Sequence, residues 1–218
     1  MPTDPTLDLE RELLAAGNGI VVGVDEVGRG AIAGPVVVGI AVIRGTAEFP
    51  AGLRDSKLIS ASRRMKLIEP VGEWADAIAT GEATAAEIDE FGIISALARA
   101  AERAFATLAI EGHDLTGATV ILDGSHNWLR ASLLPPVDIV VRPKADRDCA
   151  VVAAASVWAK VYRDGLMVDF AGSDDRYSWS SNKGYGSEGH FAAIREHGAT
   201  DLHRRTWLSS VSVSDAKD

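Results

Sequence analysis

Cysteine is almost absent from this chain of 218 residues, and its scarcity excludes two kinds of structure. Cys149 is the single cysteine, so the chain has no internal disulfide and no cysteine-rich zinc site. The residue stands in an alanine-rich stretch. We therefore expect its side chain to be a small, buried apolar group rather than a reactive thiol.

Long hydrophobic runs are also missing, although 47% of the residues are hydrophobic and 24% are charged. No apolar stretch approaches the roughly 20 residues that a membrane-spanning helix needs. Residues 1–17 are acidic and have no positively charged segment before an apolar core, so we expect no signal peptide. The composition predicts a globular, cytoplasmic protein without a membrane partner, and nothing in it demands more than a monomer.

Positive charge is in deficit, and the formal net charge is −9. This argues against broad nonspecific binding to nucleic acid, because such binding depends on Lys and Arg neutralising phosphates. Carboxylates that hold metal ions, however, count as negative in the same sum. Basic residues also gather between Arg142 and Arg147 and again at His203–Arg205. The net charge therefore leaves the partner open.

Apolar runs and helical periods alternate along the chain. Strands are predicted at residues 19–25, 35–43, 78–83, 119–123 and 137–141, with the first two forming a hairpin. Helices are predicted at 6–16, closed by Gly17; at 60–69, interrupted by Pro70; at 84–108, with a break at Gly92; at 148–170, unbroken until Gly165; and at 188–197. A long polar loop is predicted at 173–187. This order predicts an α/β layer fold, in which functional sites gather at the carboxyl ends of strands.

Acidic residues stand at the ends of three of these strands. Asp25 and Glu26 end the first strand, Asp123 ends the fourth, and Asp146 follows the fifth. If the three strands are neighbours, four carboxylates converge on one edge of the sheet. Such a set fits two Mg²⁺ or Mn²⁺ ions ~3.5–4 Å apart, the arrangement that serves phosphodiester hydrolysis. Taken alone, the Asp25–Glu26 pair is equally compatible with a solvated strand end.

The string Gly28-x-Gly30-x-x-Ala33 also matches a dinucleotide-binding fingerprint. That fingerprint requires a helix directly after the turn, because the helix N-terminus receives the pyrophosphate. Gly34, Pro35 and a valine-rich run follow instead. The sequence therefore disfavours dinucleotide binding.

The segment Val24–Gly30, together with Ala33–Pro35, resembles the signature of the ribonuclease HII family. Six further segments match that family in order: Asp55–Leu58, Asp123–Gly124, Lys144–Asp146, Ala153–Ser156 with Ala159–Asp164, Lys183–Gly186 and Thr200–Arg205. The resemblance extends from about residue 8 to residue 208, which is nearly the whole chain.

The resemblance implies a single catalytic domain of the α/β class. A ribonuclease H-like core, with a central mixed β-sheet flanked by helices, would span about residues 18–170. A C-terminal helical part would span about 171–210, followed by a frayed tail at 211–218. The implied activity is hydrolysis of the RNA strand of RNA–DNA hybrids and incision 5′ of ribonucleotides embedded in duplex DNA, leaving 3′-hydroxyl and 5′-phosphate ends.

Site residues follow from the same resemblance. The catalytic and metal-binding residues would be Asp25, Glu26, Asp123 and Asp146, holding two Mg²⁺ or Mn²⁺ ions.

Substrate contacts would come from a turn and two loops. Gly28, Arg29 and Gly30 would read the ribonucleotide 2′-hydroxyl, Tyr185 would stack on the next sugar, and Lys57 would bind phosphate. The 2′-hydroxyl both donates and accepts hydrogen bonds, which distinguishes RNA from DNA. For the two glycines the alternative is a tight turn that needs positive φ. For Tyr185 it is a packing anchor, and for Lys57 a solvated lysine.

Three other residues have alternative roles. We expect Asp164 to pair with a basic group rather than to act as a fifth ligand. Arg204 and Arg205 fit phosphate contacts and surface ion pairs equally well. The sequence does not distinguish Mg²⁺ from Mn²⁺ or long hybrids from single ribonucleotides, and its tail carries no short aromatic motif for a sliding-clamp partner.

Two other functions share these features. One is a DNA strand cutter with a related fold, such as a junction resolvase, since fold alone does not separate nucleases. The other is a noncatalytic protein that binds hybrids. The Gly28–Gly30 turn disfavours the first, because a DNA cutter has no use for a 2′-hydroxyl reader. The four carboxylates disfavour the second, because they weaken binding to phosphates.

Overall fold

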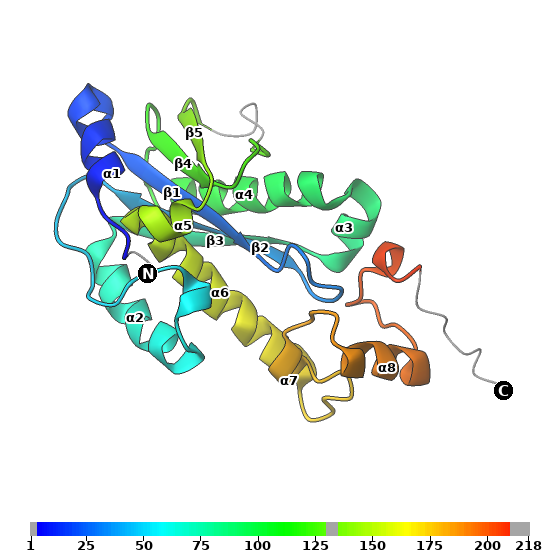
Figure 1. Cartoon of the computed structure of the whole chain (residues 1–218). Helices are drawn as coiled ribbons and strands as arrows, with labels where there is room; N and C mark the ends of the chain where they lie inside the picture. Colours follow the sequence, from blue (N-terminus) through cyan, green and yellow to red (C-terminus); the bar gives the residue numbers. More distant parts are fainter. Residues whose placement is uncertain (1–3, 130–134, 210–218) are drawn as a thin grey trace.

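A computed structural model describes residues 4–129 and 135–209. Its centre is a mixed five-stranded sheet with the strand order β3-β2-β1-β4-β5 (Figure 1). The strands are β1 (Val21–Val27), β2 (Val36–Ile43), β3 (Ala77–Ala83), β4 (Thr119–Asp123) and β5 (Asp138–Arg142). β1 and β2 are antiparallel neighbours, as are β2 and β3, whereas β4 runs parallel to both β1 and β5. The predicted hairpin and mixed sheet are confirmed.

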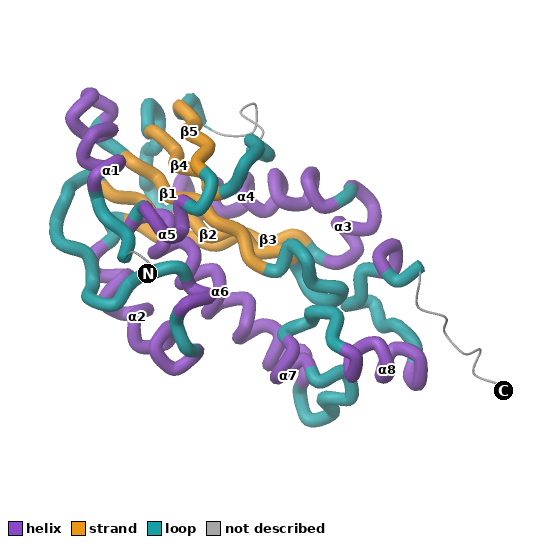
Figure 2. The backbone as a smooth tube through the Cα atoms, viewed as in Figure 1, coloured by secondary structure: helices purple, strands orange, loops and turns teal. Residues whose placement is uncertain are grey.

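Helices cover both faces of the sheet and extend beyond its end (Figure 2). The α-helices are α1 (Asp8–Leu13), α2 (Ala61–Trp74), α3 (Ala85–Phe91), α4 (Ile93–Ile110), α5 (Ala145–Asp148), α6 (Ala150–Ala171), α7 (Trp179–Asn182) and α8 (Glu188–His197). Short 3₁₀ turns lie at Ser56–Leu58 and Arg205–Trp207, and a π-helical turn at Leu14–Asn18. α4 packs on one face, while α6 packs on the other face and carries α2 on its outer side.

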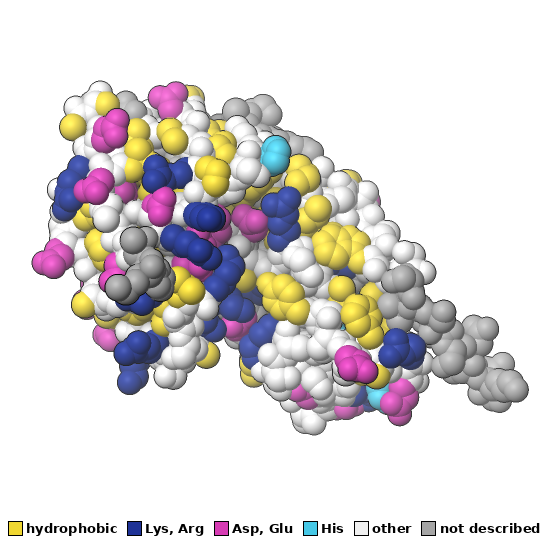
Figure 3. All heavy atoms as spheres, in the orientation of Figure 1, with side chains coloured by type: hydrophobic (Ala, Val, Ile, Leu, Met, Phe, Trp, Pro, Cys, Tyr) yellow, Lys and Arg dark blue, Asp and Glu magenta, His cyan; other side chains and the backbone are white. Residues whose placement is uncertain are grey.

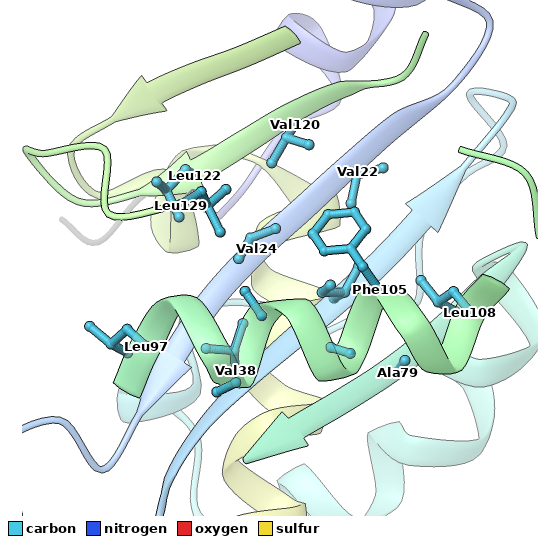
Figure 4. Close-up of a cluster of buried hydrophobic side chains, with 14 of the residues drawn as sticks. Val22, Val24, Val38, Ala79, Leu97, Phe105, Leu108, Val120, Leu122 and Leu129 are labelled. Carbon is cyan, nitrogen blue, oxygen red and sulfur yellow. The ribbon is translucent and has the colours of Figure 1, made fainter. Parts of the chain in front are cut away.

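The face under α4 holds the larger part of the core. Side chains alternate along a strand, so Val22 and Val24 of β1 point to this face together with Val38 of β2 (Figure 4). Phe105 and Leu108 of α4 meet them, and all five are buried. The helical period that the sequence predicts for residues 84–108 is confirmed as the buried stripe of α3 and α4, with the break at Gly92.

Close backbone contact replaces side-chain packing at three glycines in the sheet. A Cβ atom on Gly23 would lie 2.5 Å from the carbonyl carbon of Val151, and one on Gly39 would lie 2.4 Å from the carbonyl oxygen of Ala155. On the α4 face, a Cβ atom on Gly81 would lie 2.0 Å from the carbonyl oxygen of Ala100. The helices therefore lie directly on the strands at these three positions.

Four local predictions are wrong in detail. Pro70 does not interrupt α2, because Leu67 and Val71 are buried on either side of it and hold the helix in place. Gly165 does not break α6, since the helix continues to Ala171. Gly17 does not close the first helix. The helix continues as the π-helical turn and ends at Gly19, whose φ is 64°. The predicted loop at 173–187 contains α7.

The end of α6 supports a separate C-terminal cluster. Met167 and Ala171 of α6 pack with Tyr177, Trp179 and Ile194, and all five are buried. This confirms the predicted C-terminal helical part. The tail predicted to fray, at 211–218, lies outside the described residues. Among the helices that the structure describes, none is long and apolar enough to cross a membrane.

Two buried histidines join the loops of this cluster. Nδ1 of His190 lies 2.9 Å from the carbonyl oxygen of Tyr185, and its Nε2 lies 3.2 Å from Nε2 of His203. Nδ1 of His203 accepts a hydrogen bond of 3.0 Å from the main-chain N–H of Thr200. Burial, and then the neighbouring His190, lower the pKa of His203 to about 4. Both imidazoles therefore stay neutral near pH 7.

Acid should weaken the fold through His203. The imidazole of His203 becomes protonated below pH 6.5 in the unfolded state but only below about pH 4 in the folded state. Stability is therefore lost as the pH falls between these values. The loss from this group should reach about 2 kcal/mol at pH 5. Denaturant unfolding at pH 7 and pH 5 gives the loss in free energy of unfolding for the wild type and for His203→Gln. The difference between the two losses is the contribution of His203. His126→Gln, at an exposed position, is the control and should keep the wild-type pH dependence.

Cys149 lies directly before α6 and is buried. Burial, and then the carboxyl of Glu10, raise the pKa of its thiol to about 12. The thiol is therefore protonated at neutral pH. The predicted role as a small apolar residue is confirmed.

Candidate active site

The strand order brings the predicted acids to one edge of the sheet. Val24 pairs with Leu122 in the parallel register of β1 and β4, so Asp25 and Asp123 follow side by side. Asp25 and Glu26 lie in the last three residues of β1, as predicted. Asp146 lies in α5, one short turn beyond the end of β5, rather than at the strand end itself. Each acid thus comes from a segment whose position is set by the buried sheet.

Asp25 and Asp146 are the most deeply buried of the four, each with 4% of its surface exposed. Asp25 shares the α6 face with Gly23, and the nearby hydroxyl of Ser156 in α6 acts to lower its pKa. Burial, and then the charge of Glu26, raise the pKa of Asp25 well above its ordinary value. Asp123 acts in the same direction, whereas Lys57 opposes it. The ionised form of Asp25 therefore lacks sufficient positive charge around it.

Glu26 and Asp146 also have raised pKa values and too little positive charge around them. Burial raises the pKa of both, and the charge of Asp123 raises it further. Their basic neighbours only partly compensate: Nη1 of Arg29 lies 3.4 Å from Oε1 of Glu26, and Nζ of Lys57 lies 3.4 Å from Oδ2 of Asp146. Oδ1 of Asp123 accepts a 2.7 Å hydrogen bond from the main-chain N–H of Ala145, which ties the end of β4 to the start of α5.

The chemistry of these groups suits a hard divalent cation, since all four offer carboxylate oxygens and repel one another. As the side chains stand, no three Asp, Glu, His or Cys residues among 4–129 and 135–209 are arranged to hold a metal ion. The argument that these four residues fit a metal ion therefore rests on their carboxylate oxygens and on their uncompensated negative charge. A cation of charge two would lower the raised pKa values of Asp25, Glu26 and Asp146 together.

Lys57 reaches the site from a short 3₁₀ turn. Oδ1 of the fully buried Asp55 accepts a 2.9 Å hydrogen bond from the main-chain N–H of Lys57 and so caps this turn. Burial alone would lower the pKa of the Lys57 amine, but Asp25, Asp146 and Asp55 outweigh it and raise the pKa. The side chain is 67% exposed while its Nζ lies at Asp146. The side chain of Lys57 is therefore largely exposed to solvent, while its ammonium group lies beside the four acids.

The structure separates the roles of the two turn glycines. Gly28 has a φ of 82°, and a Cβ atom there would lie 2.0 Å from Nε of Arg163. Gly30 has neither a positive φ nor any heavy atom within 4 Å of the place where its Cβ would be. Gly28 is therefore required by the turn itself, whereas the backbone at the exposed Gly30 is open to close approach by a ligand.

Tyr185 lies close to this turn, although more than 150 residues separate them along the chain. The main-chain N–H of Ile32 donates a 2.9 Å hydrogen bond to the carbonyl of Gly184. The guanidinium of Arg163 lies 5.6 Å from the centre of the Tyr185 ring. The residue is 39% exposed, so part of its ring is open to a ligand.

Arg204 occupies neither of its predicted environments. It is fully buried, where surface ion pairs and phosphate contacts had been expected, because main-chain carbonyls of residues 28–34 satisfy its guanidinium. Arg205 is exposed, and its Nη2 lies 2.8 Å from Oδ1 of Asp201. Asp164 has the expected supporting role. It pairs with Lys160 at 2.5 Å and with Arg64 at 3.4 Å.

Arg163 is the residue that sequence reasoning missed. It is fully buried and donates hydrogen bonds to the carbonyls of Pro35 at 2.8 Å, Lys183 at 2.8 Å and Ala33 at 3.1 Å. Its sequence signal was a basic residue on the otherwise apolar face of a long alanine-rich helix. Such a residue must find buried partners, but main-chain carbonyls leave no pattern that would identify them.

The surface around the site is mixed in charge. In Figure 3, Lys and Arg side chains gather beside carboxylates in the middle of the molecule, on the face that Figure 1 shows in front of the sheet. The net charge of −9 thus conceals a local basic surface next to the acids.

Comparisons with known proteins find similar sequences and similar folds. The family model for Ribonuclease HII matches residues 22–210. A ribonuclease HII of Streptomyces coelicolor is 43% identical over 209 residues, which cover 95% of this chain and 85% of that protein. The crystal structure of the ribonuclease H2 from Pyrococcus horikoshii superposes with a TM-score of 0.66 at 26% identity, covering 86% of this chain and 93% of that one.

A more distant structure shares the fold. The Bst-RNase HIII in complex with Mn²⁺ superposes with a TM-score of 0.62 at 20% identity, covering 88% of this chain and 68% of that one.

Proposed function

The chain belongs to the ribonuclease HII family, and we propose that it cleaves the RNA strand of RNA–DNA hybrids and incises 5′ of ribonucleotides embedded in duplex DNA. As a member of this family it is a ribonuclease H, an endonucleolytic phosphodiester hydrolase. The products of the proposed reaction carry 3′-hydroxyl and 5′-phosphate ends.

The observation that carries the proposal is the convergence of Asp25, Glu26, Asp123 and Asp146 at one edge of the sheet, three of them with raised pKa values. We propose that these four hold two Mg²⁺ or Mn²⁺ ions. The Mn²⁺ complex of the structurally similar Bst-RNase HIII supports this choice of metal. When bound, such ions lower the pKa of an attacking water and stabilise the leaving oxygen.

The remaining residues bind and orient the substrate. Lys57 offers an ammonium group to the phosphate beside the acids, since its Nζ lies 3.4 Å from Asp146 and its side chain is mostly exposed. Gly30 and Arg29 present an open backbone to the 2′-hydroxyl. The half-exposed ring of Tyr185 lies beside the same turn and stacks on the following sugar. A DNA strand cutter would not need this turn.

Removal of divalent metal tests the proposal. A labelled RNA–DNA hybrid should be cut in Mg²⁺ or Mn²⁺, and a chelator in excess should abolish the cleavage. Restoring the metal should restore it, because the carboxylates themselves are unchanged. The ends of the products decide the chemistry: a DNA polymerase should extend them, since a 3′-hydroxyl is left. Cleavage that persists in the chelator would contradict the metal site.

A further inference from the structure

Arg204 makes an unusual set of contacts for a buried charge. Its guanidinium donates hydrogen bonds from Nη2 to the carbonyl of Gly28 at 2.7 Å, from Nη1 to that of Arg29 at 2.9 Å, and from Nε and Nη2 to that of Gly34 at 3.2 and 3.1 Å. The side chain also lies over the ring of Trp207, 4.9 Å from its centre. One planar group therefore holds both ends of the turn.

These contacts, together with the 3.2 Å hydrogen bond from the main-chain N–H of Ala31 to the carbonyl of Gly28, determine where the neighbouring N–H groups point. In a trans peptide the carbonyl and the following N–H lie in one plane and point in opposite directions, and no cis peptide occurs in the described residues. The carbonyls of Gly28 and Arg29 point inward to Arg204. The N–H groups of Arg29 and Gly30 must then point away from it, and both residues are exposed. Two successive donors thus face the solvent beside the acids.

A neighbouring peptide shows the same rule at work. The carbonyl of Ala33 accepts a hydrogen bond from Nη2 of Arg163, and the N–H of Gly34, in the same peptide plane, donates to the carbonyl of Leu202 at 2.7 Å. There the outward N–H finds a protein partner. At Arg29 and Gly30 the outward donors are left for a ligand.

We propose that Arg204 is a positioning residue for recognition of the ribonucleotide, because it orients the N–H groups of Arg29 and Gly30 toward the 2′-hydroxyl. The inference rests on the proposed function and gives a structural cause for the preference for a ribonucleotide over a deoxyribonucleotide. A lysine at this position would keep the charge but not the planar fork, so it could not hold three carbonyls in one arrangement. A purely structural role for Arg204 would instead affect stability without changing the preference for RNA.

Binding of two duplexes separates these roles. One duplex contains a single ribonucleotide and the other is all DNA, and both are measured with Asp25→Asn protein, so that neither is cut. Arg204→Lys should lower the ratio of the two affinities about tenfold, which corresponds to roughly 1.4 kcal/mol, the strength expected of a hydrogen bond lost to the 2′-hydroxyl. Its affinity for the all-DNA duplex should stay within about twofold of the starting protein.

Two controls accompany this variant. Arg205→Lys makes the same substitution at the next residue, whose side chain is exposed and paired with Asp201, and should leave the ratio unchanged. Gly81→Ala lowers stability on the far side of the sheet, where its Cβ would meet the backbone of α4, and should also leave the ratio unchanged.

An unchanged ratio in folded Arg204→Lys protein, or an equal fall in either control, would overturn the inference while leaving the proposed function intact. A starting protein that binds both duplexes equally would contradict the recognition of the ribonucleotide itself.

Discussion

Replacing Asp25 by asparagine is expected to abolish cleavage and, in the absence of metal ions, to raise the stability of the fold. Asparagine keeps the shape of the side chain but removes a charge that the proposed metal ions need, so kcat should fall by roughly 10³-fold or more. Burial and Glu26 raise the pKa of Asp25, which means that its charge destabilises the folded state at neutral pH. The neutral side chain avoids that cost, and the free energy of unfolding should rise.

Asp164→Asn provides the matched control. Asp164 is also a partly buried carboxylate, but it pairs with Lys160 and Arg64 outside the four-acid set. Its replacement should lower stability and leave cleavage largely intact, which is the opposite of the result at Asp25. Initial rates and denaturant unfolding in a chelator measure both effects. Full activity of Asp25→Asn would refute the site assignment, and lowered stability would refute the electrostatic account of it.

Gly28→Ala is expected to damage both fold and activity. Its Cβ would fall 2.0 Å from Nε of Arg163, a buried side chain that three main-chain carbonyls hold in place, and its φ of 82° is strained for alanine. The free energy of unfolding should drop by roughly 2–4 kcal/mol, since strain and overpacking combine. Cleavage at a ribonucleotide should fall at least about tenfold because the turn is displaced.

Gly30→Ala separates the two effects at the same turn. It has open space for a Cβ and an ordinary φ, so stability should change by no more than about 0.5 kcal/mol. Cleavage should nevertheless fall, because the added methyl group occupies the face that the ribonucleotide approaches. Thermal unfolding and initial rates on both variants check this. Unaltered cleavage by Gly30→Ala would contradict close approach of the substrate at that residue.

Much of the fold could be predicted because its strands are local apolar runs. The stretches that became β1 and β4 bury nearly every side chain up to their acids, so composition alone indicated them. Failures arose where tertiary contacts override local preference. Pro70 and Gly165 look like helix breaks in sequence, but the buried Leu67 and Val71 hold α2 on either side of Pro70, and α6 has buried residues from Ala150 to Ala171. Asp146 was assigned to a strand end because sequence does not reveal the short turn of α5.

Some residues of the candidate site could be predicted from the sequence and others could not. Its acids could be predicted from their places at the ends of apolar runs. The supporting role of Asp164 could be predicted because those acids already complete a four-carboxylate set. The buried arginines could not, since the partners of Arg204 are main-chain carbonyls about 170 residues away in sequence. Every residue carries a carbonyl, so such a contact leaves no compositional signal. The environment of Arg204, which sequence left open, became definite only with the packing of the C-terminal cluster against the turn.

The most direct test of the account uses a labelled DNA duplex that contains one ribonucleotide, beside an all-DNA duplex of the same sequence. Each is incubated with Mg²⁺, Mn²⁺ or a chelator, and the products are resolved to single nucleotides. The account predicts one metal-dependent incision, on the 5′ side of the ribonucleotide, and none in the all-DNA duplex. Cutting of the all-DNA or of branched DNA, with the ribonucleotide left intact, would mean that the Gly28–Gly30 turn does not read a 2′-hydroxyl and that the site serves a DNA-directed nuclease.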